Sequence, residues 1–322
     1  MLKALAKDRP DVSKNTFMID SSGGAQLADY ILTNGGANSF LHNGAKITSE
    51  IVMQIRLSAS SEDNREHYFT FTPRVDERFM FHYHANCLSG KREDFGTPFY
   101  SLFDALSRWM VYHFHDTSAM SPMRRAEIVE DYHDGLRHDA SNIAPFLLYL
   151  KNEKHERYKR IVNAVRLVIP FFDDFRLDVL KLGEAQKVKL SWQQKGSDYP
   201  MQPYHLSDGS LRFICLATAL LQPDPPSTII IDEPELGLHP LAIAILAELI
   251  HCAATRIQVI AATQSPALID HFAIDDIIVA NRKEGASTFT RLIRQDFSVW
   301  LENYSVGELW KKNVIDGGPV YE

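Results

Sequence analysis

Residues 228–234 read Thr-Ile-Ile-Ile-Asp-Glu-Pro, and this stretch decides the fold class. Its apolar, β-branched residues predict a strand buried in a sheet, and the strand ends in two adjacent carboxylates. Open α/β sheets bind their ligands at the carboxyl ends of the strands. We therefore expect Asp232 to hold Mg²⁺, which prefers oxygen ligands, and Glu233 to orient or deprotonate an attacking water. A strand that runs into an acidic turn gives the same pattern, so the stretch alone is only suggestive.

Helices and strands alternate on either side of this stretch. The apolar spacing predicts helices over 211–221 and 241–251, strands over 258–262 and 277–280, and a short helix around Leu268. Apolar strands that alternate with helices predict a parallel sheet that is covered on both faces.

The helix expected over 211–221 follows the sequence Leu-Ser-Asp-Gly-Ser at 206–210. Ser207 and Asp208 are suitable N-cap residues, and Gly209 lets the backbone approach a ligand closely. Free N–H groups and the helix dipole favour an anion at such an end. An ordinary capped helix explains the same residues, and the negative charge of Asp208 argues against a simple phosphate site.

The first half of the chain has a different pattern. Alternating apolar and polar residues over 51–57, 68–71 and 79–83 predict an antiparallel meander. An Asn-Gly pair at 43–44 predicts a tight hairpin, and a second hairpin is expected between 177 and 192. Helical spacing links Leu102, Leu106, Trp109 and Met110, and it returns from Tyr158 to Val168.

Composition sets limits on the class of protein. The chain has 322 residues, 45% of them hydrophobic, so it can bury a substantial core. It has no apolar stretch of membrane-spanning length and no secretion signal, and its net charge of −7 is not that of a polycation for nucleic acid. Cys87, Cys215 and Cys252 lie far apart, which predicts small buried thiols in a reducing compartment. We expect a cytoplasmic protein without a membrane partner.

Three segments together resemble the motifs of ABC-type ATPases. LSDGSLRF, IIIDEPELGLHP and VIAATQSPALID are similar to the signature, the Walker B strand with its D-loop, and the switch. Among these ATPases the chain most resembles the RecF- and SMC-like AAA group, which includes the ATPase half of the OLD nucleases. The resemblance implies an α/β fold, a P-loop NTPase head with a mostly parallel core sheet, an antiparallel β subdomain and an inserted helical lobe. It places the domains at 1–98, 99–170 and 171–322.

The same resemblance implies roles for individual residues. Asp232 binds Mg²⁺, Glu233 is the catalytic base, and Gln264 stands at the switch position, where a histidine is common. Gln can orient a water or phosphate but carries no positive charge. The residues that this resemblance assigns to ATP binding are Ser207, Asp208, Gly209, Ser210 and His239.

A Walker A loop, GxxxxGK[ST], does not occur in the 322 residues. Gly90 and Lys91 come nearest, but Arg92 follows them and Ala85 stands where glycine is required. Two explanations stay open: the chain begins at an internal methionine of a longer ATPase, or it is a degenerate head. We favour the first, because the signature and both carboxylates are intact. The chain alone should bind ATP poorly.

The resemblance implies an ATP-binding and ATP-hydrolysing protein that acts with a second ATPase head, either a copy of itself or a homologous chain. DNA repair and phage defence are both open, with DNA or an effector protein as partners by analogy. A catalytically inactive scaffold that completes the ATP site of a partner chain is the alternative. The sequences His-Tyr-His at 82–84 and His-Phe-His-Asp at 113–116 suit a metal site, but packed or hydrogen-bonding histidines explain them better.

Overall fold

The structure is a computed structural model that describes residues 108–315 apart from 133–134, 184 and 284–285, together with Gly317 and the strand residues 16–18, 51–58, 64–73 and 79–87. The chain divides into two compact units, Met1–Trp109 and Met110–Glu322. Across these described residues, no helix is both long enough and apolar enough to cross a membrane.

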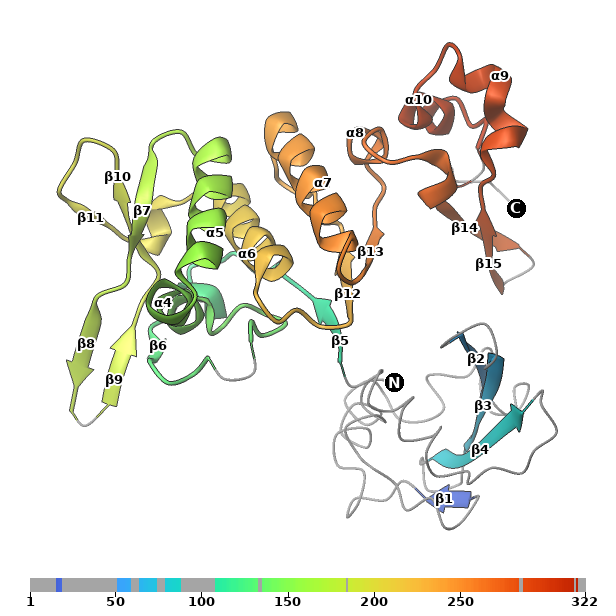
Figure 1. Cartoon of the computed structure of the whole chain (residues 1–322), viewed down its shortest axis with the longest axis horizontal. Helices are drawn as coiled ribbons and strands as arrows, with labels where there is room; N and C mark the ends of the chain where they lie inside the picture. Colours follow the sequence, from blue (N-terminus) through green and yellow to red (C-terminus); the bar gives the residue numbers. More distant parts are fainter. Residues whose placement is uncertain are drawn as a thin grey trace. The chain divides into compact units, whose positions relative to one another are not determined.

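The first unit contains a four-stranded antiparallel sheet (Figure 1). Its strands are β1 (Thr16–Met18), β2 (Ile51–Ser58), β3 (Asn64–Pro73) and β4 (Phe79–Cys87), in the order β1-β4-β3-β2. The predicted meander is thus confirmed. The hairpin expected at 43–44 and the first part of the helix expected from Leu102 lie outside the described residues.

The second unit is built around a three-stranded sheet of β5 (Trp109–Tyr112), β12 (Thr228–Asp232) and β13 (Gln258–Ala262). Strands β12 and β13 run parallel, as predicted, with their last residues, Asp232 and Ala262, in register. Strand β5 corrects the helix expected through Trp109 and Met110. The run Trp-Met-Val-Tyr is aromatic and β-branched, and it joins the edge of the sheet beside β12.

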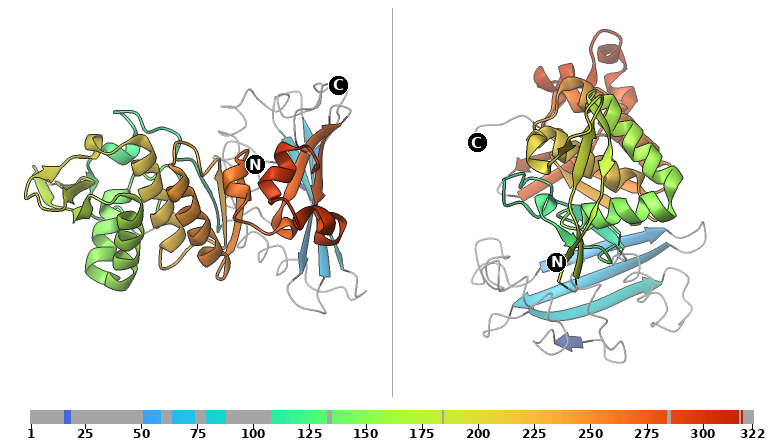
Figure 2. Two further views of the ribbon diagram at one scale, coloured as in Figure 1. Left: turned by 90° about the horizontal axis from the view of Figure 1, so that it is seen from above. Right: turned by 90° about the vertical axis from the view of Figure 1, so that its left-hand side faces the viewer.

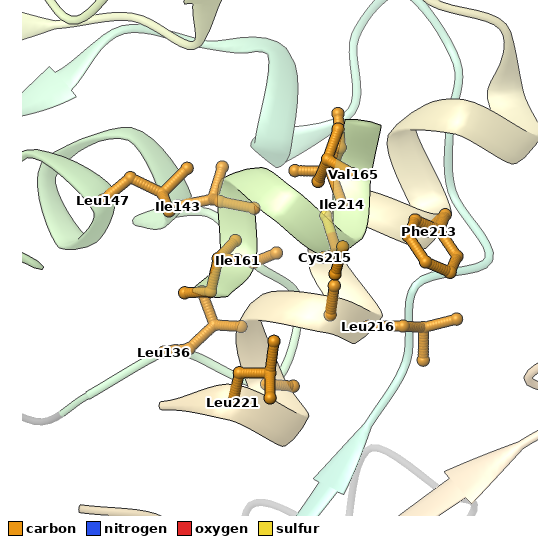
Figure 3. Close-up of a cluster of buried hydrophobic side chains, with 14 of the residues drawn as sticks. Leu136, Ile143, Leu147, Ile161, Val165, Phe213, Ile214, Cys215, Leu216 and Leu221 are labelled. Carbon is orange, nitrogen blue, oxygen red and sulfur yellow. The ribbon is translucent and has the colours of Figure 1, made fainter. Parts of the chain in front are cut away.

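Four helices pack beside one another, and α7 contacts β13 of this sheet (Figures 1 and 2). They are α4 (Ile143–Glu153), α5 (His155–Val168), α6 (Asp208–Leu221) and α7 (Pro240–Ala254). Every residue of α6 from Leu211 to Leu221 is buried, which is typical of a core helix. Figure 3 shows its side chain Ile214 near Val165 of α5, while Phe213 and Leu216 point away from the side chains of α4. The helices predicted over 158–168, 211–221 and 241–251 are confirmed.

The parallel sheet is covered unequally. Ile229 and Ile231 of β12 are buried in the same core as α6 and α7. Residues of a strand alternate between faces, so Ile230 and its neighbour Ile260 point the other way. Ile260 is 44% exposed, so the described residues cover this face less fully, and the prediction of two covered faces stays a prediction.

Short strands form the part of the chain that precedes α6. Strands β7 (Phe172–Arg176), β10 (Ser191–Gln194) and β11 (Pro200–Met201) make one sheet, and β6 (Glu127–Ile128), β9 (Ala185–Val188) and β8 (Val179–Leu182) make another. The second predicted hairpin is confirmed as the antiparallel β8–β9 pair. The buried Trp192 of β10 packs near Phe172 of β7, which anchors this region to the core.

The C-terminal residues form a smaller cluster around Ile269, Val279, Leu309 and Ile315. Its elements are α8 (Pro266–Ile269), η4 (Ile274–Asp276), β14 (Ile278–Lys283), β15 (Ala286–Arg291), η5 (Arg294–Phe297), α9 (Ser298–Leu301) and α10 (Val306–Lys311). Strand β14 pairs antiparallel with β15 and does not join the parallel sheet, contrary to the sequence prediction.

The cysteine prediction is wrong in one place. Cys215 lies buried on α6, but Cys252 is exposed on the outer side of α7. Burial raises the pKa of the Cys215 thiol, so that side chain behaves as a small apolar group.

Candidate functional site

Strand β12 delivers two carboxylates to the edge of the sheet. Asp232 ends the strand and is exposed. Glu233 leaves the strand with a positive φ of 42°, and its N–H donates to the carbonyl of Ala262 at 2.8 Å. A left-handed conformation costs a residue with a side chain about 1–2 kcal/mol. Strain of this kind is often concentrated at functional sites, and here it turns the chain sharply after Asp232.

The post-strand loop, residues 233–239, connects β12 to α7. Two backbone bonds fold it: the N–H of Leu236 donates to Glu233 at 3.1 Å, and that of Leu238 donates to Glu235 at 3.0 Å. Gly237 has φ +76°, which favours glycine. His239 is the N-cap of α7, and its Nδ1 accepts from the N–H of Leu241 at 3.3 Å. The sequence assigned His239 to ATP, and the structure gives it this capping bond.

The signature loop, residues 206–210, begins α6. Ser207 is the N-cap, as predicted, and its Oγ accepts from the N–H of Ser210 at 3.1 Å and donates to Oγ of Ser210 at 2.8 Å. A Cβ placed on Gly209 would overlap the carbonyl oxygen of Gly237. The glycine therefore allows the signature loop and the post-strand loop to meet backbone to backbone, a reason that sequence reasoning did not foresee.

Arg124 compensates the charge of Asp208. It lies at the end of η2 (Pro122–Arg124), and its guanidinium pairs with the Asp208 carboxylate at 3.2 Å. The same guanidinium donates to the carbonyls of Thr117, at 3.0 Å, and Pro203. The side chain of Arg124 is 9% exposed and that of Asp208 is 70% exposed. An aspartate in the signature loop is thus balanced by a nearly buried cation.

Arg212 connects three segments from inside the core. It is 7% exposed, and its guanidinium donates to the carbonyls of Phe114 at 3.0 Å, His115 at 3.3 Å and Leu236. Burial lowers the pKa of Arg212, while the nearby carboxylates of Asp208 and Glu233 oppose that shift. One buried guanidinium therefore fixes the segment after β5, the start of α6 and the post-strand loop.

Gln264 lies exposed two residues after β13, in the switch loop, residues 263–265. The hydroxyl of Thr263 donates to Oε1 of Glu235 at 2.6 Å and accepts from the N–H of Ser265 at 2.9 Å. The switch loop is thus tied to the post-strand loop. The predicted site residues therefore lie on three loops, and the post-strand loop contacts both of the others.

The histidines of residues 113–116 give no support to a metal site. Tyr112 and Phe114 point into the core, while His113 and His115 are exposed with ring centroids 6.4 Å apart. Over the part of the chain that the structure describes, no three His, Cys, Asp or Glu side chains form a group that could hold a metal ion. Asp232 fits Mg²⁺ in a different way, since this ion binds through one or two carboxylates and keeps several waters.

Residues 16–270 match the protein family described as "AAA domain, putative AbiEii toxin, Type IV TA system". The chain belongs to this family of AAA ATPase domains. The match spans more than half of the sequence and includes the signature loop, both carboxylates of β12 and the switch loop. No curated protein matches the chain.

Solved structures identify the fold of this AAA domain as that of an SMC head. The SMC head bound to the C-terminal winged-helix domain of ScpA is 15% identical, with a TM-score of 0.52 over 87% of this chain and 90% of that one. An SMC head from Pyrococcus furiosus with an extended coiled coil, bound to the C-terminal domain of ScpA, is 13% identical, with a TM-score of 0.51 over 94% of this chain and 88% of that one. The predicted α/β fold of an ABC-type head is thus confirmed.

Four residues that organise the site of this AAA domain were missed by sequence reasoning: Arg124, Arg212, Glu235 and Thr263. Arg124 and Arg212 bond to residues up to 98 positions away in the sequence, so no local pattern could reveal them. Glu235 and Thr263 lie inside the quoted motifs, and their polarity within apolar surroundings was the available signal.

Proposed function

We propose that this chain supplies the signature, Walker B strand and switch of an ABC-type ATPase head that binds and hydrolyses ATP with Mg²⁺. One observation carries the proposal: Gly209 and Gly237 meet backbone to backbone, so the signature loop lies against the loop that follows Asp232 and Glu233. The signature loop and the loop that follows the Walker B strand are therefore neighbours, and the Thr263–Glu235 bond ties the switch loop to the latter. Membership of an AAA domain family supports the same function.

The side chains divide the work as follows. Asp232, exposed at the end of β12, holds Mg²⁺, which would neutralise charge on the phosphates when bound. Glu233 accepts a proton from the attacking water or orients that water. Its left-handed backbone sets the direction in which its side chain leaves the chain. Gln264 orients the same water or the phosphate by hydrogen bonds. Ser207, Gly209 and Ser210 offer the N-terminal end of α6 to the phosphate of a nucleotide held by a facing head.

The phosphate-cradling P-loop comes, in this proposal, from outside the 322 residues, since the sequence holds no GxxxxGK[ST]. It lies in another segment of the same protein or in a partner chain. ATP held between two heads would draw them together, and hydrolysis would release them. The type IV toxin–antitoxin system in the family description supports a defence role more than DNA repair.

The alternative is a scaffold that lends its signature surface to a partner and does not use its own carboxylates. The exposed positions of Ser207 and Asp208 on the surface of the signature loop suit such a contact equally well. The two functions differ in whether Glu233 is needed.

A C-terminal affinity tag in the native cells recovers the protein in the form in which it is made, with any partner that it holds. Phosphate release and particle mass are then measured with Mg²⁺ and ATP, with EDTA and ATP, and for residues 1–322 produced alone. We expect the native form to hydrolyse ATP and to associate only with Mg²⁺ present, and residues 1–322 alone to bind ATP weakly. Tight ATP binding by the 322 residues would contradict an external P-loop. A native form that neither associates nor hydrolyses ATP would contradict the function.

A further inference from the structure

A carboxylate that the catalytic scheme does not use links two of the site loops. Glu235 lies in the post-strand loop, and its Oε1 accepts the hydroxyl proton of Thr263, with the two oxygens 2.6 Å apart. Hydrogen bonds to an ionised carboxylate are short and about twice as strong as those between neutral groups. This bond joins the post-strand loop, after β12, to the switch loop, after β13, through two side chains.

Thr263 passes the constraint on to the switch loop. Its Oγ1 also accepts from the N–H of Ser265 at 2.9 Å. The Thr263 hydroxyl therefore bonds across Gln264, which lies between Thr263 and Ser265 in the sequence. Ser265 is the N-cap of α8, and its Oγ accepts from the N–H of Leu268 at 3.4 Å. Gln264 therefore stands between two residues whose positions are fixed, one by Glu235 and the other by α8.

The second carboxylate oxygen of Glu235 is a further hydrogen-bond acceptor. This oxygen, Oε2, is buried and has no hydrogen-bond partner among the residues that the structure describes. A buried polar atom without a partner is rare in folded proteins and costs stability, because it loses its contacts with water without replacing them. A leucine or methionine at this position would avoid that loss, so stability of the fold alone does not account for a carboxylate here.

We propose that Glu235 is a positioning residue: it holds Gln264 in register with the post-strand loop, so that a partner that contacts the loop also sets the switch. This rests on the proposed function, in which the signature loop faces a second head, and the post-strand loop lies against the signature loop. Contacts of the post-strand backbone connect the signature loop to Glu235. Leu236 accepts from Arg212, Gly237 touches Gly209, and Glu235 lies directly before them. A shift of this loop changes the Glu235–Thr263 bond and, through it, the place of Gln264.

The test compares Thr263→Val, which keeps the shape but removes the hydroxyl, with Thr263→Ser, which keeps the hydroxyl. Glu235→Leu removes the acceptor, and Thr290→Val, at an exposed position of β15, is the matched control. The first readout is exchange of the Ser265 amide without nucleotide. We expect Thr263→Val and Glu235→Leu to speed this exchange by about tenfold, and Thr263→Ser and Thr290→Val to leave it near the wild-type rate.

The second readout separates positioning from general loss of structure. In the native form, Thr263→Val and Glu235→Leu should lower kcat by about 10- to 100-fold while the Kd for ATP stays within about twofold, and Thr263→Ser should recover most of the rate. Equal exchange in the Val and Ser variants, or a wild-type kcat in both Thr263→Val and Glu235→Leu, would overturn the proposal. Absence of ATP hydrolysis by the wild type would count against the proposed function instead, and the exchange comparison would still decide whether Glu235 holds the switch loop.

Discussion

The backbone of Gly209 lies against that of Gly237, so closely that a single added methyl group would overlap the Gly237 carbonyl oxygen. The two residues belong to the signature loop and to the post-strand loop. Gly237 also carries a left-handed φ of +76°, and Nη1 of Arg212 lies 3.2 Å from the place where its Cβ would be. The close approach of these loops depends on glycine at both positions.

Gly209→Ala should separate the two loops. The new methyl group meets backbone rather than a flexible side chain, so the loops have to move apart. Overpacking of this kind costs about 1–3 kcal/mol. The free energy of unfolding in urea measures that cost, and ATP-dependent association should weaken in parallel. A variant with wild-type stability and association would show that the contact at Gly209 is loose.

Arg124 and Asp208 should respond unequally to mutation, although they form one ion pair. Asp208→Asn removes a mostly exposed partner and should change stability by less than about 1 kcal/mol. Arg124→Leu leaves the carbonyls of Thr117 and Pro203 without their donor and should cost about 1–3 kcal/mol. Urea unfolding of both variants makes the comparison. Equal losses would mean that the ion pair itself, and not the carbonyl bonds, holds the segment.

Arg212→Lys should be strongly destabilising, although lysine keeps the positive charge. One ammonium group cannot bond the carbonyls of Phe114, His115 and Leu236, which accept from the planar guanidinium in different directions. We expect a loss of about 2 kcal/mol or more in the free energy of unfolding. Arg160→Lys, on the exposed side of α5, is the control and should lie within about 0.5 kcal/mol of wild type. Similar values for the two variants would contradict the bridging role of Arg212.

Asp232→Asn should raise the Mg²⁺ requirement of ATP hydrolysis. The amide keeps an oxygen ligand but loses the charge, and a charge-assisted contact is worth about 1.5–3 kcal/mol. The half-saturating Mg²⁺ concentration should therefore rise by about tenfold or more. A titration of the native form with Mg²⁺ at fixed ATP tests this. An unchanged midpoint would assign the metal to other ligands.

The second unit shows what sequence patterns can predict. Strand β13 has the predicted bounds, and β12 covers the apolar run of the quoted stretch and ends at its first carboxylate, as predicted, because both are short apolar runs between clear turn signals. Helix α6 was equally clear, since Ser207 caps it and its interior is apolar throughout. Such elements carry their own start and stop signals, and tertiary contacts do not override them.

All but one of the failures have a common physical cause. Trp109 and Met110 fit a helical spacing with residues before them, but pairing with β12 decides their conformation. Strand β14 is the exception, because its partner β15 follows it directly in the sequence, from Ala286 to Arg291, and a hairpin between the two runs was an available local signal. The roles of Arg124 and Arg212 depend on carbonyl groups brought from distant segments. Short-range periodicity contains no information on such contacts.

Glu233→Gln tests the central claim most directly. The amide keeps the size of the side chain but cannot accept a proton, and general-base catalysis contributes about 10²- to 10⁴-fold. We predict that kcat of the native form falls within that range while ATP binding and ATP-dependent association persist. Glu248→Gln, on the exposed side of α7, is the matched control and should retain the wild-type rate. If Glu233→Gln hydrolyses ATP at the rate of Glu248→Gln, the carboxylate is not the catalytic base, and a scaffold that completes the ATP site of a partner becomes the better account.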